Sequence, residues 1–126
     1  MRQILAALLV AFVTCASGQT FPSRPVTMIV PYAAGGSADV VARPVAAEMG
    51  KLLGENVVVE LRPGAGGNIG AEYVARSARA DGYTILLASL SLATNVSLMK
   101  LNFDPRKDLV AIGGITTFPN VLLVSS

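Results

Sequence analysis

Two glycine-rich segments of this sequence have residue types and a spacing that are typical of a ligand-binding site. Segment 31–36 follows an apolar run at Val26–Val30, and segment 62–68 follows a β-branched run at Val57–Leu61. Each pattern predicts a strand, then a turn of small residues, then a helix. Backbone N–H groups are free at the start of a helix, and the helix dipole favours negative charge there. The pattern therefore favours a site for a small anionic ligand.

The two segments resemble each other. The Pro, Ala and Gly at the first, third and fifth positions of segment 31–36 recur 32 residues later. Two copies are too few for a repeat protein, so the recurrence indicates reuse of one turn geometry. A single glycine-rich loop is more often only a tight turn, but two such loops and a polar third loop at Ser89–Asn95 favour a ligand site. For Tyr32, a place in the site wall and a place in the core both stay open.

The residue types exclude most catalytic chemistry. Histidine is absent from the 126 residues, and Cys15 is the only cysteine. Ser-His and Cys-His catalysis and His-containing metal sites are therefore excluded. A hydrolase that uses carboxylates or a Ser-Lys pair stays open, although no spacing favours one. The basic residues are scattered, so nucleic-acid binding is not expected. We expect no enzyme activity, no metal and no cofactor.

One motif points to a nucleotide and has to be weighed. Gly64, Gly66 and Gly70 follow a predicted strand and open a predicted helix. The usual third glycine of a dinucleotide fingerprint would stand at position 69, which is Ile69, and no acidic residue follows the next strand. The nucleotide-binding half of a small Rossmann-like enzyme is therefore one alternative, and a non-functional truncated domain is another.

Residues 1–18 predict a signal peptide. Arg2 supplies a positive start, Ile4–Val13 is apolar but too short to span a bilayer, and residues 16–18 fit a cleavage site. We expect secretion, a mature chain from Gln19, and no disulfide because Cys15 is removed. Lipid attachment at Cys15 and a buried N-terminal helix are the alternatives.

Strands and helices alternate along the rest of the chain. The patterns predict strands at 26–30, 57–61, 83–88, 109–115 and 121–124, helices at 37–53 and 69–78, and a short helix at 95–100. They also predict a loop after a strand at 89–95 and a surface loop at 102–108. This order predicts βαβ units in an α/β fold, with a mostly parallel sheet and flanking helices. The loops after the strands then share one edge, where such sheets bind ligands.

The first helix has clear boundaries. Apolar residues recur at helical spacing from Val41 to Leu52 and predict its buried face. Gly54 ends the helix, whereas Pro44 lies about two turns inside it and is expected to kink it.

We expect the polar residues at the starts of the two helices to stabilise those helix ends. We expect Ser37 and Asn68 to be the N-caps of the two helices. For Asp39 we favour an interaction with the helix N-terminus over direct contact with a ligand.

Several motifs in order carry a resemblance to a known family. They read PSRPVTMIVPYAAGGSADVVAR, VVVELRPGAGGNIGAEYVA, ADGYTILLAS and FDPRKDLVAIGGI. They resemble the Bug-type extracytoplasmic solute-binding receptors of tripartite tricarboxylate transporters, from about Phe21 to the last residue. The resemblance implies two α/β domains that close around a small carboxylate in a periplasmic-binding-protein (Venus flytrap) fold. It also implies a periplasmic location and membrane transporter subunits as partners.

The resemblance further implies how a ligand is held. Family members bind it largely through main-chain groups and ordered water in the loops after the early strands. This implicates Ala34, Gly36, Ser37 and Asp39 in the first loop, Ala65, Gly67 and Asn68 in the second, and Ser89 and Ser91 in the third. The sequence departs from the family at Leu61, where asparagine is frequent, at Pro44, and at Ser126, where the chain ends. Residues 19–126 are therefore expected to form an incomplete first domain.

Overall fold

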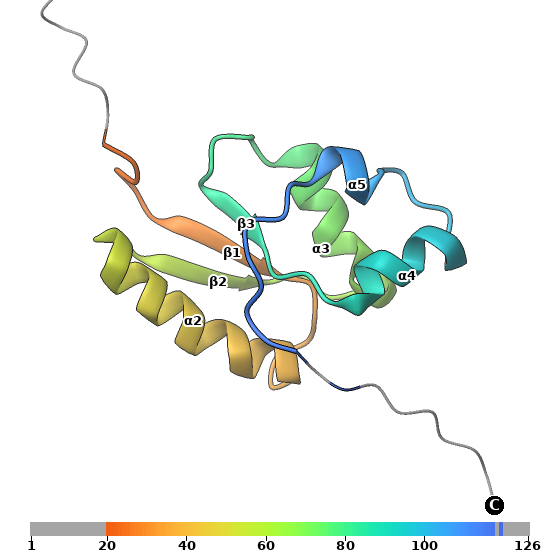
Figure 1. The fold of residues 1–126 in the computed structure, drawn as a ribbon, viewed down its shortest axis with the longest axis horizontal. Helices are drawn as coiled ribbons and strands as arrows, with labels where there is room; N and C mark the ends of the chain where they lie inside the picture. Colours follow the sequence, from red (N-terminus) through yellow and green to blue (C-terminus); the bar gives the residue numbers. More distant parts are fainter. Residues whose placement is uncertain (1–19, 118, 120–126) are drawn as a thin grey trace, which may run out of the picture.

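A computed structural model describes residues 20–117 and 119 (Figure 1). The predicted signal peptide, Cys15 and the predicted strand at 121–124 lie outside the described residues. The elements are β1 (Val26–Val30), α2 (Ser37–Leu53), β2 (Val57–Leu61), a 3₁₀ turn η2 (Ala65–Gly67), α3 (Asn68–Glu72), a π-helical turn η3 (Tyr73–Ser77), β3 (Thr84–Leu86), α4 (Leu90–Leu98) and α5 (Pro105–Asp108).

The sheet has three strands in the order β2-β1-β3, and both pairs are parallel. Val30 is opposite Leu61 on one side, and Ile29 is opposite Leu86 on the other. The central strand β1 is apolar except for Thr27, and its other four residues are buried, because neighbours cover both its edges and helices cover both its faces. The predicted α/β fold with a parallel sheet is confirmed.

The helices lie on both faces of the sheet. Figure 1 shows α2 on one face and α3, α4 and α5 on the other. The chain crosses from β1 outward to β2, and then back past β1 to β3, so right-handed crossovers place α2 and α3 on opposite faces. The strand order therefore reverses between β1 and β3. The carboxyl ends of these two strands form the switch-point crevice where sheets of this kind bind ligands.

The core on the α2 side is built from aliphatic and small residues. Met28 and Val30 of β1 pack with Ala42 and Ala46 of α2, and all four are buried. The two alanines allow the helix backbone to approach the sheet closely. The buried face is therefore centred on these alanines, and Leu52, part of the predicted face, is 87% exposed.

Helix α2 has the predicted bounds. Gly54 ends it with φ +74°, and its N–H donates to the Gly50 carbonyl at 3.0 Å. The helix continues through the exposed Pro44, so that water can solvate the carbonyl that lacks a donor there. The N-cap is Gly36 and not the predicted Ser37, which is the first helical residue.

A glycine brings the second helical segment against the first loop. A Cβ atom at Gly70 would lie 2.8 Å from Pro31 Cβ and 3.0 Å from the Arg62 carbonyl oxygen. Only glycine fits this close approach of α3 to the ends of β1 and β2. The third glycine of a dinucleotide motif also allows close packing of a helix on a strand, but it would stand at position 69 of this sequence, one residue before Gly70.

The segment after β3 differs most from the predictions. The predicted loop at 89–95 is wrong, because most of it forms α4, which Ser89 caps by accepting a bond from the Ser91 N–H at 3.4 Å. The predicted loop at 102–108 contains α5, capped by Asp104 and with Pro105 as its first residue.

The predicted strand at 109–115 is also wrong. No strand is present there, and Val110 and Ile112 are 86% and 80% exposed. A strand needs a hydrogen-bonded neighbour, and within residues 20–117 this apolar run pairs with none. An apolar β-branched pattern cannot by itself form the element.

Candidate functional site

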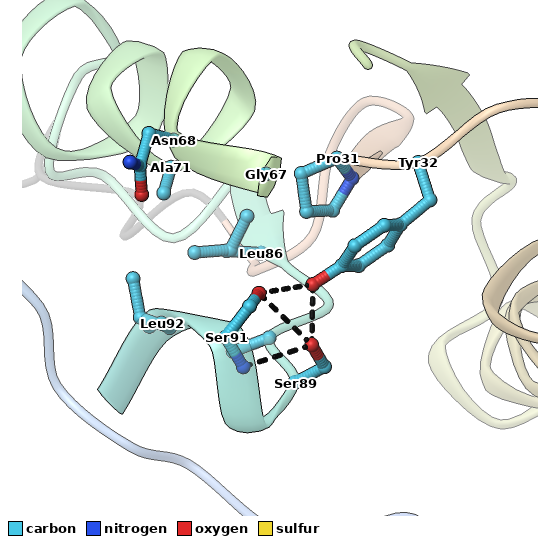
Figure 2. A pocket seen from close by; sticks show the side chains of 10 residues that line it. Pro31, Tyr32, Gly67, Asn68, Ala71, Leu86, Ser89, Ser91 and Leu92 are labelled. Carbon is cyan, nitrogen blue, oxygen red and sulfur yellow. Dashed lines mark hydrogen bonds between the residues drawn. The ribbon is translucent and has the colours of Figure 1, made fainter. Parts of the chain in front are cut away.

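The loops after the three parallel strands meet at one edge of the sheet. Figure 2 shows the pocket that they share, with Tyr32 reaching across from the end of β1. The pocket is lined by Pro31, Tyr32, Gly67, Asn68, Ala71, Leu86, Ala88, Ser89, Ser91 and Leu92. Its volume of about 10 Å³ is enough for one water molecule. Side chains thus fill most of the crevice between β1 and β3.

Three hydroxyl groups, from Tyr32, Ser89 and Ser91, form what we call the hydroxyl cluster. The Tyr32 hydroxyl is hydrogen-bonded to Ser89 Oγ and, at 2.6 Å, to Ser91 Oγ. The two serine hydroxyls lie 3.2 Å apart. The cluster joins the first loop to the third across the switch point (Figure 2). Each hydroxyl can donate or accept a hydrogen bond, so the cluster can serve a carboxylate or a bridging water.

Tyr32 has both roles that the sequence left open. Its ring is partly buried and packs against the core cluster of β1 and α2, while its hydroxyl lines the pocket. An aromatic side chain with a polar tip suits a position where one end is apolar and the other end faces a polar crevice.

The second loop approaches the hydroxyl cluster closely enough to require glycine. A Cβ atom at Gly67 would lie 3.2 Å from the Tyr32 hydroxyl oxygen and 3.5 Å from Ser91 Oγ. Gly67 also has φ +94°, a conformation that side chains disfavour. All three loops therefore meet at this one residue.

An asparagine pair lies behind the second loop. Asn68, which was predicted to be an N-cap, is instead the first residue of α3, and Gly67 is the cap. The Asn68 side chain turns toward α4, where Nδ2 of Asn95 donates to Asn68 Oδ1 at 2.9 Å. Both asparagines are buried. Sequence reasoning missed Asn95 because an asparagine at the end of a predicted polar loop gives no sign of burial.

Asp39 bonds to its own helix start. Its Oδ2 accepts the Gly35 N–H at 2.9 Å, and its Oδ1 is 2.8 Å from Arg43 Nε one turn along α2. The backbone hydrogen bond from Gly35 and, to a lesser extent, the Arg43 guanidinium hold the pKa of Asp39 below its ordinary value of 3.8. The carboxylate is buried at the start of α2, and Asp39 does not line the pocket.

The structure gathers some of the predicted site residues and not others. Gly67, Asn68, Ser89 and Ser91 line the pocket, whereas Ala34, Gly36, Ser37, Asp39 and Ala65 do not. The first three of these are exposed around the start of α2.

Two of the predicted main-chain donors are already used in turns. The Gly36 N–H donates to the Ala33 carbonyl at 3.4 Å, and the Gly67 N–H donates to the Gly64 carbonyl at 2.9 Å. The first-turn N–H groups of a helix have no intrahelical acceptor. In α2 these belong to Ser37 and the two residues after it, because the Gly36 N–H is already bonded.

The described part of the chain shows neither a metal-binding cluster nor a membrane-spanning helix. Within residues 20–117 and 119, no group of three or more Cys, Asp or Glu side chains could hold a metal ion. Nor does any helix in this range combine the length and apolar character needed to cross a bilayer.

Comparison with known proteins identifies the family. Residues 41–126 match the model described as "Tripartite tricarboxylate transporter family receptor". The chain belongs to this receptor family. Its relatives are solute-binding receptors and not enzymes, which removes the support for a nucleotide-dependent enzyme.

Individual relatives agree in sequence and fold. The chain is 46% identical to Protein BugT of Bordetella pertussis over 112 residues, which are 86% of this chain and 34% of BugT. It is 43% identical to MatC of Rhodopseudomonas palustris with bound malate, with a TM-score of 0.64 over 70% of this chain and 30% of MatC. It is 40% identical to an R. palustris protein solved with adipate, with a TM-score of 0.55 over 57% of this chain and 24% of that one. The chain thus spans about a third of the length of the curated relatives it matches.

Proposed function

We propose that this chain forms one side of the ligand site of an extracytoplasmic receptor for a small organic carboxylate. Its membership of the receptor family, together with three loops that meet at the switch point, supports this proposal. The relatives solved with malate and adipate point to a dicarboxylate. We further propose that residues 1–18 are a signal peptide, and that residues 19–126 form part of an N-terminal α/β domain. The receptor then works in the periplasm and delivers its ligand to membrane transporter subunits.

In this site a bound carboxylate has to be stabilised by neutral hydrogen-bond donors, because the nearby basic side chains are already paired. Arg62 is the only basic residue of the three loops, and its guanidinium lies 3.5 Å from the centroid of the Tyr73 ring and bonds to Glu60 at 2.6 Å. Arg43 is paired with Asp39. The remaining donors are the N–H groups in the first turn of the 17-residue helix α2 and the hydroxyl cluster. Both are neutral, so the helix dipole supplies the favourable potential.

A proline substitution tests the main-chain donors directly. Ser37 is the first helical residue, where proline is tolerated, and Gly36 has φ −73° and ψ 167°, which suits a residue before proline. Ser37→Pro therefore removes one N–H donor and leaves α2 folded. A hydrogen bond to a charged group contributes about 1.5–3 kcal/mol, so malate affinity should fall by roughly tenfold or more.

Ser37→Ala is the matched variant, because it removes the hydroxyl and keeps the N–H. Isothermal titration of the full chain with malate should show a much larger loss for Ser37→Pro than for Ser37→Ala. Equal affinities for the two variants would contradict a main-chain contact at this position. An equal loss in both variants relative to the wild-type chain would assign the contact to the hydroxyl, which both variants lack.

The ligand class is tested with pairs of equal shape and different charge. Malate and adipate should raise the melting temperature of the full chain, because a ligand that binds only the folded state stabilises it. The corresponding diamides should have no effect. A response to diamides or sugars without a response to any acid would refute the carboxylate, and saturable binding of NAD(P) would favour the nucleotide alternative. A folded chain that responds to none of these compounds would support a domain without function.

A further inference from the structure

The second loop holds an unusual backbone shape. Four consecutive residues have positive φ: Gly64 at +130°, Ala65 at +47°, Gly66 at +63° and Gly67 at +94°. Three are glycines, but Ala65 carries a Cβ atom that disfavours this region. Such a backbone persists only where surrounding contacts hold it in place. The contacts on Gly66 and Gly67 therefore decide whether the loop keeps its shape.

Asn95 makes these contacts from α4. Its Nδ2 donates to the Gly66 carbonyl at 3.3 Å and to Asn68 Oδ1 at 2.9 Å. Nδ2 would also lie only 3.4 Å from a Cβ at Gly66, so the amide is packed directly against this glycine. The Asn68 amide in turn donates to Met99 Sδ at 3.2 Å, at the end of α4. One buried side chain thus bonds to a positive-φ glycine of the loop and to the first residue of the helix that follows it.

We propose that Asn95 is a positioning residue, which fixes residues 64–68 in the shape that the ligand site requires. It does so through both hydrogen bonds of its amide, and it holds the loop after β2 to the helix after β3. Because Gly67 also approaches the Tyr32 hydroxyl, movement of this loop alters the pocket wall. The inference rests on the proposed carboxylate site for its effect on binding, but its effect on the loop can be measured without a ligand.

Hydrogen exchange of two amides reports the loop directly. The N–H of Gly67 donates to the Gly64 carbonyl, and the N–H of Asn68 donates to the Ala65 carbonyl. The N–H of Leu87 donates to the Ile29 carbonyl of β1 and serves as the reference amide for the sheet. In the full chain with Asn95→Ala, exchange at Gly67 and Asn68 should speed up about tenfold, with no change at Leu87.

Two further variants keep the test decisive. Asn95→Leu preserves the approximate size of the side chain and removes the NH₂ donor without placing a charge beside the two acceptor oxygens, so it should have the same effect even if the cavity in the alanine variant impairs folding. Asn102→Ala is the matched control, since its exposed Nδ2 donates to Glu72 Oε1 at 3.2 Å, away from the loop, and it should change neither amide.

The outcomes separate this inference from the proposed function. Exchange that is unchanged in the Asn95 variants, or that rises equally at Leu87, would overturn the inference. Calorimetry with malate is the second measurement, in which the Asn95 variants should bind roughly tenfold more weakly. Normal malate affinity with a loosened loop would overturn a positioning role. If the wild-type chain binds neither malate nor adipate, the proposed function fails, while the exchange result still decides whether Asn95 holds the loop.

Discussion

Gly70→Ala is the substitution for which the structure makes the sharpest prediction. The added methyl group would lie 2.8 Å from Pro31 Cβ, 3.1 Å from Pro31 Cα and 3.0 Å from the Arg62 carbonyl oxygen. These atoms belong to a proline ring and to the backbone at the ends of two paired strands, so none can rotate away. The helix α3 must move off the sheet instead.

The expected magnitude follows from two opposing terms. Overpacking a well-packed contact costs about 1–3 kcal/mol. Alanine is better than glycine inside a helix by about 1 kcal/mol. A contact of 2.8 Å with atoms that cannot move puts the first term near its upper end, so the net destabilisation is about 2 kcal/mol, which lowers the melting temperature of a domain of this size by roughly 8–16 °C.

Urea unfolding followed by circular dichroism measures this change. Gly113→Ala is the control, because no atom lies within 4 Å of its added methyl group and it should not destabilise the chain. A Gly70→Ala variant as stable as wild type, or more stable, would refute the close packing of α3 against the end of β1.

Three further predictions concern the loops. Gly67→Ala should destabilise the chain by about 1–2 kcal/mol because of its positive φ, and Tyr32→Phe in the same chain should recover part of the loss by removing the hydroxyl that the methyl group meets. Ser89→Ala should cost about 1 kcal/mol because it removes the N-cap of α4. The lowered pKa of Asp39 means that its carboxylate stabilises the fold fully above about pH 4, and that this contribution is lost as pH falls through the lowered value. Asp39→Asn should therefore lower the free energy of unfolding at pH 6 and reduce the further decrease in this free energy as the pH falls.

The urea concentration at the midpoint of unfolding measures the change in stability for each of these predictions. A Gly67→Ala loss that is the same with and without the Tyr32→Phe substitution would exclude the steric contact. The exposed Ser97 lies in the same helix as the Ser89 cap, and a Ser97→Ala loss as large as that of Ser89→Ala would contradict capping. An Asp39→Asn chain as acid-sensitive as wild type would contradict the lowered pKa of the Asp39 carboxyl. Asp104 also has a pKa lowered by Arg106, so some acid sensitivity remains in every variant.

Local patterns predicted the elements that form locally. The apolar runs of β1 and β2 and both ends of α2 were found because buried strands and helix stops depend on adjacent residues. Asp104 and Pro105 are a local signal for the start of a helix, but a loop was predicted at 102–108, where α5 begins. The strand expected at 109–115 was wrong because strand formation depends on a partner that the pattern does not contain.

The sequence by itself determined the class of fold, the positions of the glycine-rich turns, the absence of histidine chemistry and the family resemblance. Only the tertiary structure decided which loop residues meet. Tyr32 and Ser91 are 59 positions apart, and their hydroxyls share a hydrogen bond because β1 and β3 are neighbours in the sheet. Asn95 likewise reaches Gly66 only because α4 packs beside the second loop. Strand order and helix packing bring distant residues together, and neither is encoded in the spacing of residues along the chain.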